Sequence, residues 1–392
     1  MKKLKGNTIF FIDYFVFWLA DAFLVPYLGL FYVERDLSGA QIAVLSVVEA
    51  VIAPISAIVI GFVMNMVRSK KAFFVGIPVG SAVAALIMYY SGNFGGIVVA
   101  TAAIYFCRTP FSSMVDRVLM ARLHDRPEDY GVFRLGGSMG YGVGALIAGV
   151  VYAAFKCRPL FFMYVPAIII TGLCCLKFPM EDESPARSKR PDLKALFNVK
   201  SLVSTGGFLK IYGTLALFGF ITSSAGKYMA VYVDQQGLDS SITGRMIAFA
   251  MIGEIIMFLV FPVFSKKFGP EALFFFGFLF YMARSVSILF IASIPLWLVM
   301  IMQIIGGAEF SVMWAAATSM VEANYPPESG FLAHTLKSVF NTSIGYGLGC
   351  VLLSVFYDLG QMKAGFGVLT AVNAICLVGY GLLAVNAKKK AA

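Results

Sequence analysis

The sequence contains a series of apolar runs, most of them about 20 residues long or longer. A helix needs roughly 20 apolar residues to cross a hydrocarbon core of about 30 Å. The composition agrees with this reading, since 59% of the 392 residues are hydrophobic, 13% are charged and the mean hydropathy is +0.83. So little polar surface cannot cover a soluble globule of this length. We therefore expect an integral membrane protein.

The apolar runs predict twelve transmembrane helices. Strands of a membrane barrel are not expected, because alternating segments of about ten residues are absent from the sequence. The predicted helices lie near residues 8–32, 40–65, 73–91, 96–122, 131–154, 159–178, 207–233, 243–264, 271–292, 296–321, 331–357 and 365–386. The longest polar stretch separates the sixth helix from the seventh. It predicts an N-terminal six-helix half (1–178), a cytoplasmic linker (179–206) and a C-terminal six-helix half (207–392).

The basic residues of the connections predict the orientation, because cytoplasmic loops retain Lys and Arg. With both termini inside, nineteen basic residues fall on the cytoplasmic side. The outer side has four, namely Arg35, Lys156, Arg158 and Lys363. This asymmetry explains the net charge of +10 without a nucleic-acid partner. We expect a bacterial inner-membrane protein with both termini in the cytoplasm.

The sequence offers no motif for catalysis. The six cysteines lie in or beside apolar runs without metal or disulfide spacing, and neither histidine has a ligand partner at useful spacing. A phosphate-binding glycine loop, a nucleophile motif and a cleavable signal peptide are also absent. We therefore expect neither an enzyme nor an ATP-driven pump, and no metal or cofactor.

The two halves of the sequence look like copies of one unit. "GSMGYGVG" from Gly137 aligns with "TSIGYGLG" from Thr342, an interval of 205 residues. The same interval relates Glu49 to Glu254, and both glutamates lie in predicted membrane helices. Parallel repeats about an axis along the membrane normal are one way in which transporters build a central site. The glycines of the repeat let helix backbones approach closely.

Charged residues in the predicted helices form two pairs. Asp116 and Arg134 lie on consecutive antiparallel helices at similar distances from the connecting loop, so they should sit at equal depth. Arg284 and Glu309 repeat this arrangement in the C-terminal half. A charge at the bilayer centre costs about 2.5–3.5 kcal/mol on insertion scales, so such residues face a partner or a water-filled cavity. We favour a cavity role, with a purely structural ion pair as the alternative.

Three short motifs carry a resemblance to a known family. They are "DYGVFRLGGSMGY" at Asp129 to Tyr141, "GEIIMF" at Gly253 to Phe258 and "QIIGGAEF" at Gln303 to Phe310. Together with the hydropathy of nearly the whole chain, they resemble the proton-coupled branch of the major facilitator superfamily, which includes lactose permease, nucleoside symporters and phenylpropionate-type permeases. "GFVMNMVRSKK" is similar to a degenerate form of the superfamily's Gly-x-x-x-Asp-Arg signature, with Asn65 in place of the aspartate.

The resemblance implies roles for the charged residues. Asp116 and Arg134 match the carboxylate and the arginine that bind sugar in lactose permease, and Glu254 matches a further substrate-contacting glutamate. Arg284 and Glu309 correspond to the arginine and the proton-carrying glutamate. These matches imply substrate binding by the first three residues and proton coupling by the last two.

The sequence also departs from lactose permease. Gly306 stands in place of a histidine, Tyr141 in place of a sugar-stacking tryptophan, and the seventh helix lacks the matching aspartate. That helix carries Lys227 instead, which is the approximate counterpart of Asp21 in the first helix. We predict an Asp21–Lys227 contact across the halves, and we include both residues and Tyr141 among the substrate-binding candidates.

Three further basic residues lie in or at the edge of the predicted helices, namely Arg108, Arg117 and Lys337. They could line a cavity, and Arg117 and Lys337 could equally extend their charges to the membrane interface.

Taken together, the residues and the resemblance predict an all-α secondary transporter with a cavity between its two halves. The leading expectation is a monomer in the bilayer that uses the proton gradient to take up a small polar organic solute, such as a sugar, oligosaccharide or nucleoside. Three alternatives stay open. They are an importer of aromatic or other organic acids, a proton-driven efflux antiporter and a non-transporting membrane sensor.

Overall fold

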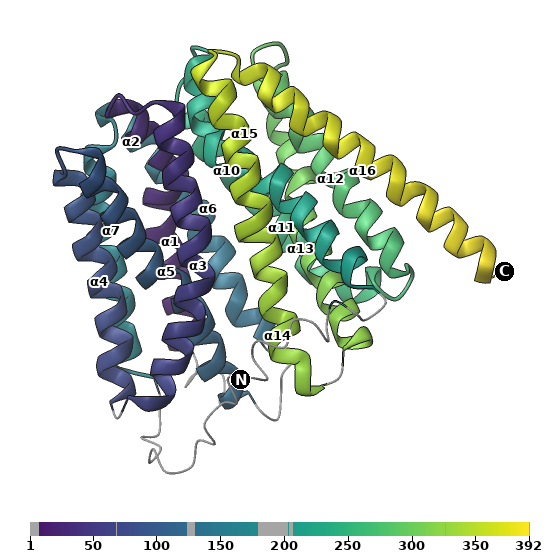
Figure 1. Cartoon of the computed structure of the whole chain (residues 1–392), viewed down its shortest axis with the longest axis horizontal. Helices are drawn as coiled ribbons and strands as arrows, with labels where there is room; N and C mark the ends of the chain where they lie inside the picture. Colours follow the sequence, from purple (N-terminus) through teal and green to yellow (C-terminus); the bar gives the residue numbers. More distant parts are fainter. Residues whose placement is uncertain are drawn as a thin grey trace. The chain divides into compact units, whose positions relative to one another are not determined.

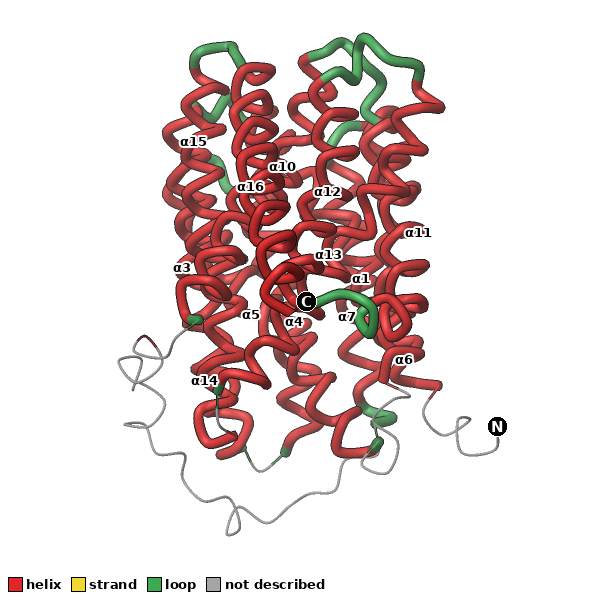
Figure 2. The backbone as a smooth tube through the Cα atoms, turned by 90° about the vertical axis from the view of Figure 1, so that its right-hand side faces the viewer, coloured by secondary structure: helices red, strands yellow, loops and turns green. Residues whose placement is uncertain are grey.

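The computed structural model describes residues 8–67, 69–123, 130–178, 203, 207–325 and 327–391, and the regular elements in these ranges are all helices (Figure 2). Eleven helical spans of this part of the chain are long and apolar enough to cross a membrane. The remaining span of the predicted twelve carries Lys227 and several hydroxyl side chains, which lower its hydropathy. The all-α membrane fold with two pseudo-symmetric six-helix halves is confirmed. The predicted linker 179–206 lies outside the described residues except for Val203.

Contacts within the chain divide it into two units. Figure 1 labels the helices of the chain and colours them along the sequence. Unit 1 comprises Met1–Leu37, Val44–Lys189 and Asp239–Ala248, and unit 2 comprises Ser38–Ala43, Arg190–Leu238 and Phe249–Ala392. The first half of the chain forms α1 (Thr8–Leu24), η1 (Val25–Tyr27), α2 (Leu28–Glu34), α3 (Gly39–Met66), α4 (Lys70–Tyr90), α5 (Phe94–Arg122), α6 (Tyr130–Phe155) and α7 (Arg158–Cys175). The second half forms η4 (Leu209–Gly213), α10 (Thr214–Gln235), α11 (Ser241–Phe264), α12 (Pro270–Leu289), α13 (Leu296–Asn324), α14 (Pro327–Ser338), η5 (Val339–Gly345), α15 (Tyr346–Asp358) and α16 (Met362–Ala391).

Polar side chains at the helix ends satisfy backbone groups that the helices leave open. The Asn93 side chain accepts a hydrogen bond from Gly96 N at 2.7 Å and so caps α5. Before α11, the Asp239 carboxylate accepts from Ser241 N at 2.8 Å. Hydrogen bonds from Ser241 hold the pKa of the Asp239 carboxyl below its usual range. These caps place the helix boundaries in the polar connections, as the hydropathy predicts.

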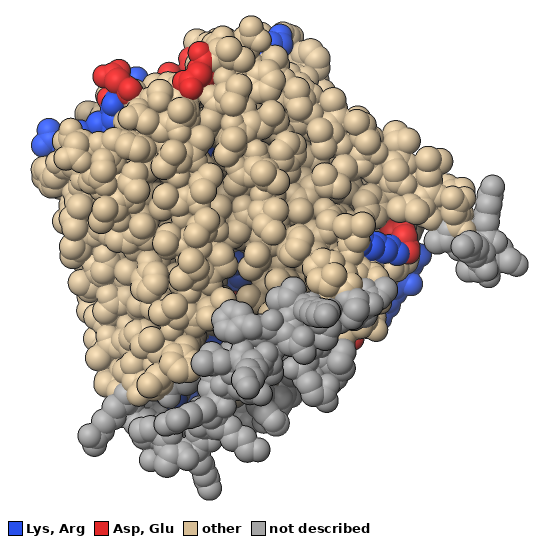
Figure 3. Space-filling view, in the orientation of Figure 1, with Lys and Arg blue, Asp and Glu red and all other residues tan. Residues whose placement is uncertain are grey.

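The helices of each unit pack around their own core. In unit 1, α1 packs against α6 and α7, and α4 packs against α5 and α7. In unit 2, α12 packs against α13 and α16, and α10 packs against η5 and α15. Large apolar side chains also lie on exposed helix faces, for example Val99 at 67% and Ile375 at 72% exposure. Most charged side chains visible in Figure 3 gather near the helix ends, which leaves the helix sides apolar, as lipid contact requires.

Glycine pairs four residues apart create equivalent close packing in the two units. In unit 1, a Cβ at Gly140 would overlap the backbone of Phe15 on α1, and a Cβ at Gly144 would lie 2.7 Å from Leu19 O. In unit 2, a Cβ at Gly345 or at Gly349 would likewise overlap a backbone carbonyl oxygen of α10. Each glycine of the second pair follows its counterpart by 205 residues, the interval of the sequence repeat. The repeat is therefore a repeat of helix packing.

A further crossing in unit 2 brings α11 against α13. A Cβ at Gly307 would overlap Ala250 O, and a Cβ at Gly253 would overlap Ile304 O. Only glycine fits these two positions without a shift of backbone. The crossing holds the helices that carry Glu254 and Glu309 next to each other.

We expect Gly307→Ala to destabilise the protein, because the new methyl group forces α11 and α13 apart at an overpacked site, at a cost of about 1–3 kcal/mol. Gly379→Ala is the matched control, since a Cβ at Gly379 meets no atom within 4 Å. The measurement is thermal unfolding in detergent, where Gly307→Ala should melt below the wild type and Gly379→Ala should not. Equal melting temperatures for the two variants would contradict the crossing.

Candidate functional site

In unit 1, two tyrosines hold the carboxylate of Asp116. The Tyr130 hydroxyl donates a hydrogen bond to Asp116 Oδ1 at 2.9 Å. The Tyr14 hydroxyl donates to the same oxygen. Asp116 lies on α5, Tyr14 on α1 and Tyr130 in the first turn of α6, so three helices meet at one carboxylate. The two hydroxyl donors fix the position of the Asp116 carboxylate within the helical bundle.

The guanidinium of Arg134 lies over aromatic rings of α1. Its guanidinium carbon is 5.6 Å from the centre of the Tyr14 ring and 4.9 Å from the centre of the Trp18 ring. Between Asp116 and Arg134 the described chain contains no direct ion pair, and Tyr14 contacts both of them. The cation–π contacts offset part of the cost of holding the guanidinium in the membrane. Its hydrogen-bond donors are thereby left available for a bound anion or hydroxyl group.

Tyr141 extends the aromatic group around Arg134. Its ring meets Trp18 edge to face at a centroid distance of 6.0 Å. The Trp18 Nε1 group is buried and has no acceptor among the described residues. An indole N–H that is buried in this way is a donor that a solute could satisfy. The face formed by Trp18, Tyr141 and Arg134 thus combines apolar area with hydrogen-bond donors.

Asp21 has its partner within unit 1. Arg108 Nη2 donates to Asp21 Oδ2 at 2.8 Å, and Arg108 Nε donates to Oδ1, which makes the pair bidentate. The guanidinium also lies over the Tyr105 ring at 5.2 Å. Lys227, the predicted partner of Asp21, is buried on α10 of unit 2. The contact between Asp21 and Lys227 stays a prediction.

In unit 2, Arg284 and Glu309 form an ion pair. Arg284 Nη1 donates to Glu309 Oε1 at 2.9 Å, and 5% of the Glu309 side chain is exposed. A Cβ at Gly306 would overlap the Arg284 Cβ, so the glycine of "GGAEF" lets α12 and α13 approach at this level. The pair meets as the sequence spacing predicts. Glu309 Oε2 is buried and has no hydrogen-bond partner in the described part of the chain.

The two glutamates that the 205-residue interval relates, Glu49 and Glu254, also lie in the helical bundles. Glu254 is half-buried on α11, and its backbone oxygen accepts a hydrogen bond from Ser311 Oγ at 3.2 Å. This contact places Glu254 beside the helix that carries Glu309. In unit 1, the buried Glu49 accepts a hydrogen bond from the Tyr32 hydroxyl at 3.4 Å. Each unit therefore holds an acid at the position that the 205-residue interval predicts.

Asp13 is a buried acid that the motifs do not identify. Its Oδ1 atom lies 3.6 Å from Cys175 Sγ, and its Oδ2 atom has no hydrogen-bond partner among the described residues. A buried carboxyl oxygen without a hydrogen-bond partner is energetically costly. Within the described ranges, no group of three His, Cys, Asp or Glu side chains is arranged to hold a metal ion.

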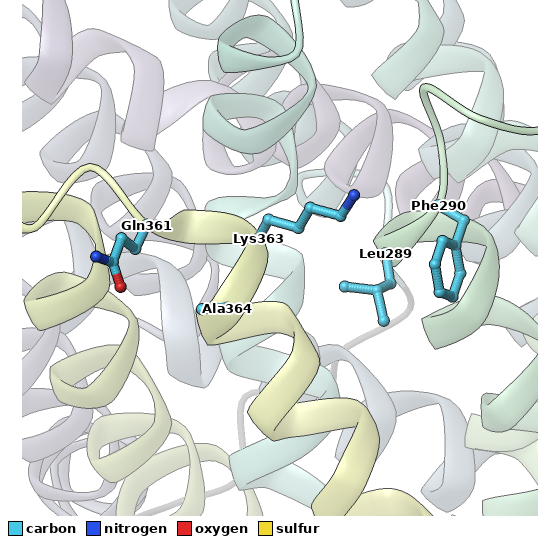
Figure 4. A pocket seen from close by; sticks show the side chains of 5 residues that line it. All are labelled: Leu289, Phe290, Gln361, Lys363 and Ala364. Atoms are coloured by element: carbon cyan, nitrogen blue, oxygen red, sulfur yellow. The ribbon is translucent and has the colours of Figure 1, made fainter.

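A surface pocket of about 510 Å³ lies at the ends of α12 and α16 in unit 2. It is lined by Leu289, Phe290, Gln361, Lys363 and Ala364, and Lys363 extends from α16 towards the two apolar side chains (Figure 4). The Lys363 ammonium is 5.9 Å from the Phe290 ring centre. None of the predicted site residues lines this pocket, so it is separate from the charged groups described above.

The sequence patterns identify the charged residues but miss their aromatic neighbours. Tyr14 and Trp18 are four residues apart on α1, and Asp21 follows three residues later, so the three share one helix face. This spacing was the available signal for the two aromatic residues. Tyr130 lies within the quoted "DYGVFRLGGSMGY" motif, but its contact with Asp116 depends on how α5 and α6 pack.

Comparisons with known proteins agree with this architecture. The model of the MFS_1 like family matches residues 8–368. A maltose permease of Geobacillus stearothermophilus is 22% identical over 381 residues, which cover 95% of this chain and 94% of the relative. The crystal structure of the nucleoside transporter NupG has a TM-score of 0.82 at 12% identity and covers 96% of this chain and 98% of its own. A variant of the peptide transporter POT has a TM-score of 0.74 at 15% identity, with 97% and 94% covered.

We expect the Asp21–Arg108 pair to be strongly coupled, because removing one partner leaves a buried charge uncompensated at a cost of about 3–5 kcal/mol. Asp21→Asn alone should therefore lower the melting temperature more than Asp21→Asn combined with Arg108→Met. Arg117→Gln is the control on the same helix, since Arg117 is exposed and should change stability by less than about 0.5 kcal/mol. Thermal unfolding in detergent of the wild type, Asp21→Asn, Arg108→Met, the double variant and Arg117→Gln measures the coupling. Additive losses in the double variant would refute it.

Proposed function

The chain belongs to the MFS_1 like family and is a membrane transporter of the major facilitator type, and we propose that it couples uptake of a small polar organic solute to inward proton movement. A sugar, an oligosaccharide or a nucleoside is the proposed solute. The maltose permease and the nucleoside transporter among the similar proteins support this class. The proton gradient is the proposed energy source, with no cofactor.

The observation that carries the proposal is the Arg284–Glu309 pair. Glu309 is buried, one of its oxygens is bound by Arg284, and the other has no hydrogen-bond partner among the described residues. A cation beside a carboxyl group weakens its hold on a proton, whereas apolar burial strengthens it. If a conformational change moves Arg284 relative to Glu309, Glu309 would therefore bind a proton in one state of the protein and release it in another.

The proposed solute contacts begin with Arg134 and Asp116 in unit 1. The guanidinium offers a planar set of donors for hydroxyl or carboxylate oxygens. Asp116, oriented by Tyr14 and Tyr130, accepts from solute hydroxyls. The further proposed contacts come from other acids, bases and aromatics, namely Glu254, Tyr141, Asp21 and Lys227.

We further propose that the chain is a monomer in a bacterial inner membrane with both termini in the cytoplasm. The excess of Lys and Arg in the connections assigned to the inner side supports this orientation. In this orientation the proton gradient of an energised cell would be directed inward, as uptake requires.

Transport by the purified protein in sealed vesicles tests the proposal directly. Counterflow of radiolabelled maltose or uridine reports carrier activity without an energy source. Accumulation that appears only when an inward proton gradient is imposed reports coupling. The proposal fails if neither solute class exchanges, or if exchange occurs but a proton gradient drives no accumulation.

We expect Glu309→Gln to abolish proton-driven accumulation while binding and counterflow persist, because glutamine resembles the permanently protonated acid. Glu322→Gln is the matched control, since Glu322 is an exposed glutamate on the same helix. The measurement compares uptake under a proton gradient with counterflow at zero gradient, for equal amounts of reconstituted protein.

Two results would contradict this role for Glu309. If Glu309→Gln still accumulates solute against its gradient, another acid carries the proton, and Asp21, Asp116, Glu254 and Asp13 are the next candidates. If binding, exchange and folding are all lost together, the residue has a structural role.

We expect Arg134→Lys to bind the transported solute at least about tenfold more weakly, because a lysine ammonium lacks the planar fork of donors and hydrogen bonds to charged groups contribute about 1.5–3 kcal/mol. Arg245→Lys is the control, since Arg245 is exposed on α11 and contacts Ser241. Equilibrium binding to both variants and the wild type gives the affinities. Wild-type affinity in Arg134→Lys would exclude direct binding by this arginine.

A further inference from the structure

Gly137 on α6 is surrounded by side chains of the candidate site. A Cβ at this buried position would lie 2.4 Å from Arg134 Nη1, 2.7 Å from Trp18 Cδ1 and 3.0 Å from Trp18 Nε1. Atoms that are not bonded to each other do not come as close as the first two distances. A side chain at position 137 therefore fits only if the guanidinium or the indole moves.

The glycine lies between two residues of the candidate site on one face of α6. Arg134, Gly137 and Tyr141 are spaced by three and four residues, so they share this face. The pyrrole edge of Trp18, from α1, lies where the side chain of residue 137 would be. The guanidinium of Arg134 lies over the indole at 4.9 Å, and the Tyr141 ring meets the indole edge to face. Trp18 thus reaches Arg134 through a space that the missing side chain leaves.

The repeat separates Gly137 from the glycines that serve helix packing. For Gly140 and Gly144, the atom nearest to an added Cβ is a backbone carbonyl oxygen of α1, and both positions are glycine again 205 residues later. Gly137 recurs as the exposed Thr342. The arginine three residues before Gly137 recurs as Val339. The unit that lacks the arginine at this position therefore also lacks the glycine.

We propose that Gly137 positions Arg134 for solute binding. Aromatic rings hold the guanidinium, and no ion pair with Asp116 fixes it in the described part of the chain. Its orientation therefore depends on the indole, and the place of the indole depends on Gly137. An arginine that is ordered before the solute arrives does not lose rotamer freedom on binding. This inference rests on the proposed function, in which Arg134 donates to the solute, and Gly137 itself does not touch the solute.

Gly137→Ala should weaken solute binding without weakening the fold. We expect the affinity to fall at least about tenfold, because a hydrogen bond to a charged group contributes about that factor. The melting temperature should stay equal or rise, since alanine stabilises a helix relative to glycine and the end of the arginine side chain moves more easily than backbone. The probe is maltose or uridine, whichever the preparation exchanges. Its equilibrium binding and thermal unfolding are measured on the full chain in detergent.

Two glycines of the same helix are the controls. A Cβ at Gly131 meets no atom within 4 Å, so Gly131→Ala should keep the wild-type affinity. A Cβ at Gly140 would overlap the backbone of Phe15, so Gly140→Ala should lower the melting temperature. The three variants therefore separate a positioning glycine from a neutral one and from a packing one.

A double-mutant cycle tests whether Gly137 acts through Trp18. Trp18→Leu removes the indole and should itself weaken binding. Adding Gly137→Ala to Trp18→Leu should cause no further loss, because the contact through which Gly137 acts is already gone.

Tryptophan fluorescence reports the same contact without a solute. The chain has three tryptophans, so Trp297→Phe combined with Trp314→Phe leaves Trp18 as the only emitter. In this background Gly137→Ala should change the emission of Trp18, because the guanidinium on its ring moves, and Gly131→Ala should not.

Several outcomes would overturn the inference. They are wild-type affinity in Gly137→Ala, a lower melting temperature or loss of folding in this variant, additive losses in the double variant, and unchanged Trp18 emission. Failure of the proposed function has a different signature, since the wild type would then exchange neither maltose nor uridine, which overturns both proposals. If the wild type exchanges a solute and Gly137→Ala binds it normally, the positioning role alone is refuted.

Discussion

The structure depends on one electrostatic constraint, namely that a charge held among membrane helices needs compensation from neighbouring side chains. Four described cations meet this constraint in three ways. Arg108 uses a bidentate carboxylate, Arg284 uses one oxygen of Glu309, and Arg134 and Lys337 use aromatic rings. These solutions require helices close enough for side chains to meet, which explains why glycines lie at several crossings near them. Gly306 adjoins Arg284, and Gly137 adjoins both Arg134 and Trp18.

The relative depth of two residues on consecutive helices could be predicted from the sequence, because it depends only on the constant rise of a helix and the position of the connecting loop. Arg284 and Glu309 illustrate this, since their equal distance from the short turn places them at one level and the structure pairs them. The repeat could be predicted for a related reason. An interval of 205 residues is a property of the chain, and Gly140 with Gly345 and Gly144 with Gly349 show that it extends to helix packing.

Rotation about the helix axis could not be predicted in the same way, because it is set by packing between helices that are distant in sequence. Asp116 and Arg134 both contact Tyr14, yet Asp116 meets the hydroxyls of Tyr14 and Tyr130 while Arg134 meets rings. Asp21 meets Arg108, which is 87 residues away on α5. No local pattern encodes that distance. A charge pattern therefore identifies which residues need partners, but not which partners they have.

Asp21 and Glu309 differ in how many of their carboxylate oxygens are hydrogen-bonded to an arginine. The Asp21 carboxylate is bound at both oxygens by Arg108, so moving either residue alone would expose a buried charge, and the pair acts as a clamp between α1 and α5. Glu309 is bound at one oxygen, and its second oxygen is buried without a partner. Protonating that oxygen would cost no existing hydrogen bond. Glu309 can therefore take up a proton without losing its hydrogen bond from Arg284, whereas protonating either oxygen of Asp21 would break one of its two bonds from Arg108.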